Sequence, residues 1–254
     1  MKVRHIHLVC LLFSAVFLGC KDHSAKKITI ATAANMQFAM KALTAKFYEE
    51  SGIDCEVIVS SSGKLTAQIK EGAPYDIFVS ADEKYPLNLA KNGFTAQKPQ
   101  IYAYGNLVLW SLKTDLKPTI IALSDPKIVH IALANPKTAP YGVAAIETLK
   151  NSNLYDQVEN KLVFGESISQ TNQFIISGAA EVGFTAKSVV LSPAMKNKGS
   201  WSEIDSSLYS PIAQAAVLLK SATNNNEAKQ FYDFLFSLKA KTILENFGYL
   251  VPEK

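Results

Sequence analysis

Short apolar segments alternate with longer amphipathic segments through the first part of the chain. Strand-length apolar runs are followed by helix-length segments in three successive pairs, at 27–31 and 37–51, at 55–59 and 64–71, and at 76–79 and 80–93. Strands that alternate with helices over short connections pair in parallel, with helices on both faces of the sheet. The pattern therefore predicts an α/β fold.

The same alternation restarts after Pro99. Strands are predicted at 101–110, 128–133, 162–164, 182–185 and 211–219, and helices at 141–150, at 170–177 and after the cap at 224–226. The long strands 101–110 and 211–219 would cross between two α/β lobes and form a hinge beside a cleft. The predicted lobes are 27–105 together with 217–254, and 106–216.

The N-terminus has the pattern of a secretion signal. Lys2 and Arg4 precede an apolar run over 6–18, which is shorter than the ~20 residues of a membrane span. The segment Phe17-Leu-Gly-Cys20 resembles a lipoprotein cleavage box, in which the cysteine becomes the lipidated first residue. Residues 1–19 are therefore predicted as a signal peptide and 20–26 as a lipid-anchored or free tether. Cleavage at an ordinary site nearby, leaving a soluble periplasmic protein, is the alternative.

Charge and cysteine content narrow the function classes. Of 26 basic residues, Lys2 and Arg4 fall in the signal, so 24 remain against 22 acidic residues. This balance argues against nucleic acid, which requires a concentrated basic face. Cys55 is the one cysteine beyond Cys20 and is predicted to be a buried strand residue without a disulfide partner.

Four short loops run from a predicted strand into a predicted helix and carry the main functional signal. They are 31–35 (Ala-Thr-Ala-Ala-Asn), 59–63 (Val-Ser-Ser-Ser-Gly), 137–142 (Lys-Thr-Ala-Pro-Tyr-Gly) and 165–169 (Gly-Glu-Ser-Ile-Ser). The first N–H groups of a helix lack partners within it and carry partial positive charge. Ordinary helix capping explains any one such loop. Four loops at the ligand-binding edge of open sheets predict a shared oxyanion pocket.

Catalytic alternatives have weaker support. Ser61-Ser-Gly-Lys64 matches the Ser-x-x-Lys of serine acyl enzymes, but Ser-Asp-Asn and Lys-Thr-Gly companions are missing. A P-loop would need a glycine where Ile58 stands. Only His23 and His130 lie outside the signal, which argues against a hydrolase triad or a zinc site. The sequence predicts no enzyme activity, no cofactor and no bound metal cation.

Several segments resemble the molybdate-binding proteins of ABC uptake systems. The resemblance covers 27–252 and rests on 28–35, 60–69, 135–142, 247–252 and above all on Gly72-Ala-Pro-Tyr-Asp-Ile-Phe-Val-Ser-Ala-Asp82. It implies a type II periplasmic-binding-protein fold, in which two lobes are joined by two crossover strands. It further implies that the chain closes on molybdate or tungstate, acts as a monomer, and delivers the anion to an inner-membrane permease.

The resemblance also implies ligand positions. The family's four ligand loops fall on Ala34 with Asn35, on Ser62, on Tyr141, and on the backbone N–H of Ile168. Many members add a tyrosine after Gly-Ile-Val, where this chain reads Gly183-Phe-Thr-Ala186. Tyr141 could replace that donor from the opposite side of the pocket, so the coordination stays open.

A pocket that offers only hydrogen-bond donors is predicted to select between oxyanions. Backbone amides and the side chains of Asn35, Ser62 and Tyr141 would hold a dianion by neutral hydrogen bonds. Asp76 and Asp82 are predicted to be structural caps rather than ligands. Phosphate keeps a proton at neutral pH and needs an acceptor, and Glu166 is the only acidic residue in the four loops. Poor phosphate binding is therefore expected, while binding of sulfate or another oxyanion is the close alternative.

Overall fold

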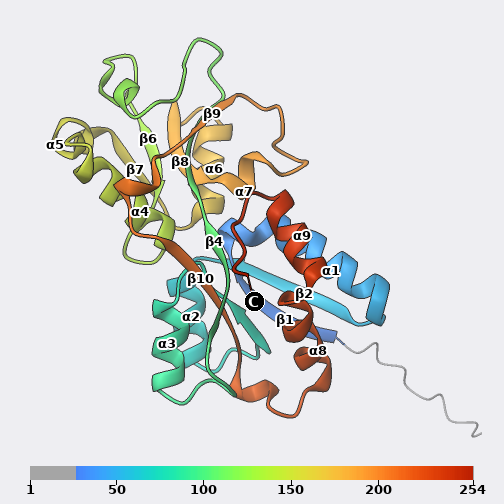
Figure 1. Ribbon diagram of the computed structural model, residues 1–254. Helices are drawn as coiled ribbons and strands as arrows, with labels where there is room; N and C mark the ends of the chain where they lie inside the picture. Colours follow the sequence, from blue (N-terminus) through green and yellow to red (C-terminus); the bar gives the residue numbers. More distant parts are fainter. Residues whose placement is uncertain (1–26, 254) are drawn as a thin grey trace, which may run out of the picture.

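Residues 27–253 are described by a computed structural model, and they form two lobes (Figure 1). In spatial order, the first sheet contains β2 (Asp54–Ser60), β1 (Lys27–Ala33), β3 (Ile77–Val79), β10 (Ile212–Leu218) and β4 (Gln100–Gly105). The second sheet contains β7 (Leu162–Gly165), β6 (Ile131–Ala134), β8 (Val182–Ala186), β5 (Leu107–Ser111) and β9 (Ser200–Glu203). The predicted two-lobed α/β architecture is confirmed. The predicted signal peptide and tether lie outside the described residues.

The two sheets share one pattern of strand directions, although no repeat is visible in the sequence. Strand β1 pairs in parallel with β2 and β3, and β6 pairs in parallel with β7 and β8. In each sheet the fourth strand in spatial order is antiparallel to both of its neighbours. Each strand end in one lobe therefore has a counterpart at the same position in the other lobe.

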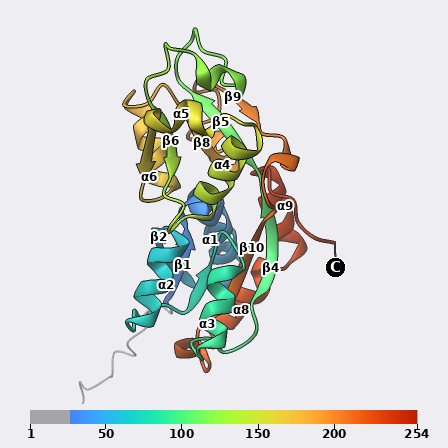
Figure 2. The same cartoon turned by 90° about the vertical axis from the view of Figure 1, so that its left-hand side faces the viewer.

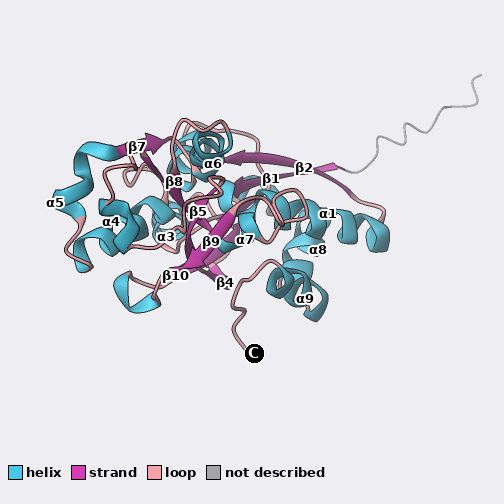
Figure 3. Cartoon of the chain, turned by 90° about the horizontal axis from the view of Figure 1, so that it is seen from above, coloured by secondary structure: helices cyan, strands magenta, loops and turns pink. Residues whose placement is uncertain are grey.

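Helices cover both faces of the first sheet, and residues of β1, an interior strand, are buried on opposite sides. Ile28 and Ile30 pack into a core with α1 (Gln37–Ser51), α8 (Asn226–Leu235) and α9 (Leu238–Asn246). Ala31 packs on the other face, with α2 (Ser62–Lys70) and α3 (Lys84–Lys91). Seen from above, the strands run through the middle of the molecule with helices on either side (Figure 3).

The second lobe is covered in the same way. Leu107 and Leu109 of β5 pack with α4 (Pro140–Asn151), whereas Val108 and Trp110 pack with α6 (Ile168–Ile176). The shorter elements are α5 (Tyr155–Val158), α7 (Lys187–Val190), η1 (Ala34–Met36), η2 (Ile121–Ser124), η3 (Glu159–Lys161), η4 (Ser206–Leu208) and η5 (Lys220–Ala222). Among the described residues, no helix is long and apolar enough to span a bilayer.

Two connections join the lobes where long crossover strands were predicted (Figure 2). The predicted strand 101–110 is interrupted at Asn106, with β4 in the first sheet and β5 in the second. The other connection runs from β9 to β10, and β10 belongs wholly to the first sheet. The chain therefore returns to the first sheet by Ile212, before the lobe boundary predicted at 216/217.

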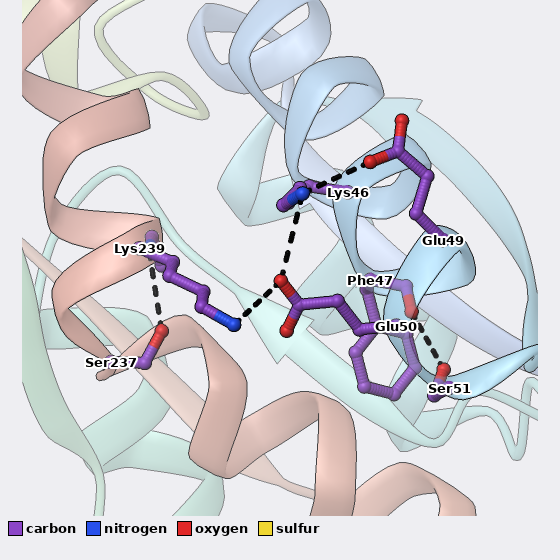
Figure 4. Close-up of polar contacts among 8 residues, drawn as sticks. Lys46, Phe47, Glu49, Glu50, Ser51, Ser237 and Lys239 are labelled. Carbon is purple, nitrogen blue, oxygen red and sulfur yellow. Dashed lines mark hydrogen bonds and ion pairs between the residues drawn. The ribbon is translucent and has the colours of Figure 1, made fainter.

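The C-terminal segment forms two helices where one was predicted. Chain direction changes at Ser237, whose Oγ accepts a hydrogen bond from Ala240 N and so begins α9. Lys239 on this new helix pairs with Glu50 of α1 at 2.8 Å, and Lys46 lies 3.7 Å from the same carboxylate (Figure 4). The hydrogen bond from Lys239 lowers the pKa of Glu50. These contacts dock the C-terminal helices against the first helix of the same lobe.

Candidate functional site

Four loops from the two lobes meet around one small cavity. All five predicted ligand positions line it, namely Ala34, Asn35, Ser62, Tyr141 and Ile168. The rest of its lining consists of Ala33, Ser61, Ala81, Ala139 and Pro140. The structure thus brings together every position that the sequence placed in the pocket.

The cavity lies at equivalent strand ends in the two lobes. Its four loops follow the carboxyl ends of β1 and β2 in the first lobe and of β6 and β7 in the second. Strands β1 and β6 each have parallel neighbours on both sides. The chain connections diverge at such a strand and open a crevice, which is where open α/β sheets bind ligands.

Each of the four loops leads directly into a helix. The helical segments begin at Ala34, Ser62, Pro140 and Ile168. The first N–H groups of a helix have no acceptor inside it, and they carry partial positive charge. Pro140 has no N–H, so Tyr141 supplies the first donor of its helix. The cavity is therefore surrounded by helix starts that favour an anion.

Two consecutive serines begin α2, and their hydroxyls differ. Ser62 Oγ accepts a hydrogen bond from Ala81 N at 3.0 Å, which leaves its own proton available for another acceptor. Ser61 Oγ is buried and has no hydrogen-bond partner among residues 27–253. The sequence analysis named Ser61 only as the nucleophile of the acyl-enzyme alternative. It did not predict that Ser61 lines the cavity.

The side chain of Asn35 points into a buried polar network. Its Nδ2 donates to Gln214 Oε1 at 2.8 Å and to Tyr249 Oη at 3.1 Å. Tyr102 Oη donates to the same Gln214 oxygen at 2.8 Å. Both N–H groups of the Asn35 amide are thus used inside the protein, and this geometry does not support the predicted side-chain donor. The backbone N–H at the start of the helix is the remaining donor of Asn35.

Tyr141 crosses from the second lobe to the hinge strands of the first. Its hydroxyl accepts a hydrogen bond from Gln214 Nε2 at 3.3 Å and retains its own proton for donation. The residue is 1% exposed. A Cβ atom at Gly105, the last residue of β4, would overlap this hydroxyl and lie 3.0 Å from Tyr141 Cζ. The absence of a side chain at Gly105 therefore makes room for Tyr141.

No charged side chain belongs to the cavity lining formed by the described residues. Glu166 forms an ion pair with Lys64 across the cleft and lies outside the lining. Asp82 Oδ1 accepts from Tyr85 N at 3.2 Å, and Asp76 Oδ2 accepts from Thr29 N at 2.8 Å. The two aspartates thus serve as backbone acceptors, as predicted.

Polar contacts also join the two lobes beside the start of α2. Gly63 N donates to Thr138 O in the other lobe at 2.9 Å, and Tyr85 Oη donates to Lys137 O at 3.2 Å. A Cβ atom at Gly63 would lie 3.0 Å from both Thr138 Cα and Thr138 O. Glycine at this position lets the two lobes meet at backbone distance.

A sequence profile described as "Bacterial extracellular solute-binding protein" matches residues 28–250. The chain belongs to this family. Among its relatives, the molybdate-binding protein ModA of Azotobacter vinelandii is 36% identical over 237 residues, which cover 92% of this chain and 94% of the relative. That of Rhodobacter capsulatus is 38% identical over 228 residues, covering 89% of each chain. The solved structure of the Azotobacter vinelandii periplasmic molybdate-binding protein superposes with a TM-score of 0.83 at 35% identity, covering 89% of this chain and all of that one.

The contacts of this solute-binding protein do not favour the acyl-enzyme alternative. A Ser-x-x-Lys nucleophile needs its lysine within hydrogen-bond reach of the serine. Lys64 instead pairs with Glu166, and Ser61 Oγ has no partner among the described residues. His130, expected within a strand, lies exposed just before β6. Neither residue has the surroundings of an activated catalytic group.

Three buried polar residues that support Asn35 were also missed, and they lie far from the four loops in the sequence. Gln214 is fully buried in β10, and Tyr102 and Tyr249 complete the network beneath Asn35. The sequence did indicate one of them, because Gln214 is the single strongly polar residue in the apolar run 211–219. Such a residue in a buried strand needs polar partners.

The buried tyrosines of this solute-binding protein predict a loss of stability in alkali. Burial raises the pKa of the Tyr102, Tyr141 and Tyr249 hydroxyls above the ordinary value near 10. Unfolding would let these groups ionise near pH 10, whereas folding keeps them neutral, so their stabilising contribution is lost as pH rises above about 10. We expect the melting temperature, followed by circular dichroism, to be level from pH 7 to 9 and to fall above pH 10. A smaller alkaline fall is expected in Tyr249→Phe, and an equal fall in that variant would contradict the assignment.

Proposed function

We propose that this chain is the substrate-binding component of an ABC transporter and captures molybdate, with tungstate as an equivalent guest. The observation that carries the proposal is a small cavity lined by uncharged groups at four helix starts. Two relatives that match nearly the whole chain are molybdate-binding proteins by name. In this role the chain would act as a monomer and deliver the anion to a membrane permease.

Neutral donors can hold a dianion tightly in such a cavity. The proposed donors are the backbone N–H groups of Ala34, Asn35, Tyr141 and Ile168 and the hydroxyl of Ser62. A hydrogen bond to a charged group contributes about 1.5–3 kcal/mol. Micromolar affinity requires about 8 kcal/mol, which five such bonds of about 2 kcal/mol each would exceed.

The same lining disfavours protonated oxyanions. Phosphate at neutral pH carries a proton that needs an acceptor, and a buried proton donor without a partner is costly. Glu166, the one acidic candidate, is engaged by Lys64 outside the cavity. Fully deprotonated tetrahedral dianions therefore fit the site best, and size must separate molybdate from sulfate.

Calorimetric titration with molybdate, tungstate, sulfate and phosphate tests this proposal. We expect micromolar or tighter binding of molybdate and tungstate, weaker binding of sulfate, and phosphate binding at least about a hundredfold weaker than molybdate. Preferential binding of sulfate would favour the alternative of a sulfate-binding protein. Phosphate binding as tight as molybdate binding would contradict the all-donor description of the cavity.

We place the mature chain in the periplasm or cell envelope, anchored through a lipid on Cys20. The basic start, the short apolar run and the cysteine that follows Gly19 support this location. A tether over 20–26 would let the lobes reach the permease from the membrane surface.

A further inference from the structure

Two buried hydroxyls have no hydrogen-bond partner among residues 27–253, and they differ in position. They are Thr32 Oγ1 in β1 and Ser61 Oγ at the start of α2. Ser61 belongs to the cavity lining, whereas Thr32 does not. Burying a hydroxyl without a partner is unfavourable, so the lone hydroxyl in the lining points to a guest that would pair with it.

No hydrogen bond within the described residues explains why Ser61 carries a hydroxyl. Serine preceding a helix usually accepts a hydrogen bond from an N–H of the first turn, yet Ser61 makes no such bond. The N–H of Gly63, in that turn, donates to Thr138 O of the opposite lobe instead. Lys64, the nearest candidate base in the sequence, is paired with Glu166. The hydroxyl therefore neither caps the helix nor contacts a catalytic partner.

We propose that Ser61 Oγ donates a hydrogen bond directly to the bound oxyanion, as a binding residue beyond the five predicted ones. This inference rests on the proposed function, because it assigns a further donor to the same cavity. Ser61 and Ser62 would act as a pair, with the Ser62 hydroxyl oriented by Ala81 N and the Ser61 hydroxyl oriented by the guest itself. Closure of the lobes around an anion would satisfy Ser61, so this residue links closure to occupancy.

Calorimetry with sodium molybdate on Ser61→Ala and Thr32→Val tests the inference. Thr32→Val is the matched control, because it removes the other unpartnered hydroxyl at nearly constant side-chain volume and leaves the cavity lining intact. We expect Ser61→Ala to weaken molybdate binding by about tenfold or more, as for a lost hydrogen bond to a charged group. Thr32→Val should stay within about twofold of the natural protein.

Unliganded melting temperatures separate a lost contact from a damaged fold. Ser61→Ala should melt at the same temperature as the natural protein or higher, since it removes an unpaired buried hydroxyl, while its molybdate-induced shift should shrink. Ser61→Cys, which keeps the volume but donates weakly, should reproduce the affinity loss if the alanine variant does not fold.

Three outcomes overturn the inference. Ser61→Ala binding molybdate within twofold of the natural protein would show that the hydroxyl does not contact the anion. Equal affinity losses in Ser61→Ala and Thr32→Val would show a general effect of strand and helix packing. Failure of the natural protein to bind molybdate would instead overturn the proposed function, and the role of Ser61 with it.

Discussion

Ser62→Asp is expected to abolish molybdate binding. Ser62 is 1% exposed, and its Oγ accepts from Ala81 N. A carboxylate can accept the same hydrogen bond, but it places a negative charge in a lining that otherwise has none. At about 4 Å and an effective dielectric constant near 20, each pair of unit charges repels by about 4 kcal/mol. We therefore expect a loss of at least about a thousandfold in affinity, measured by calorimetry at pH 8.

Ser62→Asn provides the matched control for charge. Asparagine has nearly the size of aspartate and can also accept from Ala81 N, so it tests crowding without the negative charge. We expect Ser62→Asn to bind molybdate more tightly than Ser62→Asp by at least about tenfold. Equal losses in the two variants would show that volume, rather than charge, determines the effect at this position.

Gly105→Ala is expected to weaken both the fold and ligand binding. The added methyl group would overlap the Tyr141 hydroxyl and Gln214 Nε2, and both side chains are buried. Overpacking of this kind costs about 1–3 kcal/mol, and it displaces the tyrosine that bridges the second lobe and the hinge. We expect urea denaturation to show that loss in the free energy of unfolding, with molybdate affinity lowered by about tenfold or more.

A second substitution at Tyr141 identifies the cause. Tyr141→Phe removes the hydroxyl that the new methyl group would meet, so Gly105→Ala should cost less stability in the Tyr141→Phe background than in the natural one. The difference between the two costs is the coupling energy of the pair. An identical cost in both backgrounds would place the strain elsewhere in the hinge.

Local patterns were enough to predict the elements that carry the site. The helix predicted at 37–51 has those bounds in the structure, because Gly52 ends it in a left-handed conformation with φ of 70°. The four loops could be grouped because parallel strands bring their carboxyl ends to one edge of a sheet. Each of these inferences depends only on neighbouring residues and on general rules of sheet topology.

The remaining features depend on contacts between distant parts of the chain. The hydrogen bonds of the Asn35 side chain could not be predicted, because its partners Gln214 and Tyr249 lie 179 and 214 residues away in the sequence. Likewise, the apolar run 101–110 continues through Asn106 because both halves are buried, although each half is buried in a different sheet. Hydrophobic periodicity reports burial but does not say which core a strand enters.

The division of the cavity between two lobes bears on how the guest could leave. Each lobe supplies two of the four loops, so each lobe keeps only half of the lining when the two separate. A membrane partner that holds the two lobes apart could thus release the bound anion by separating the lobes alone. No side chain would have to change its protonation, and the emptied protein would be ready for another cycle.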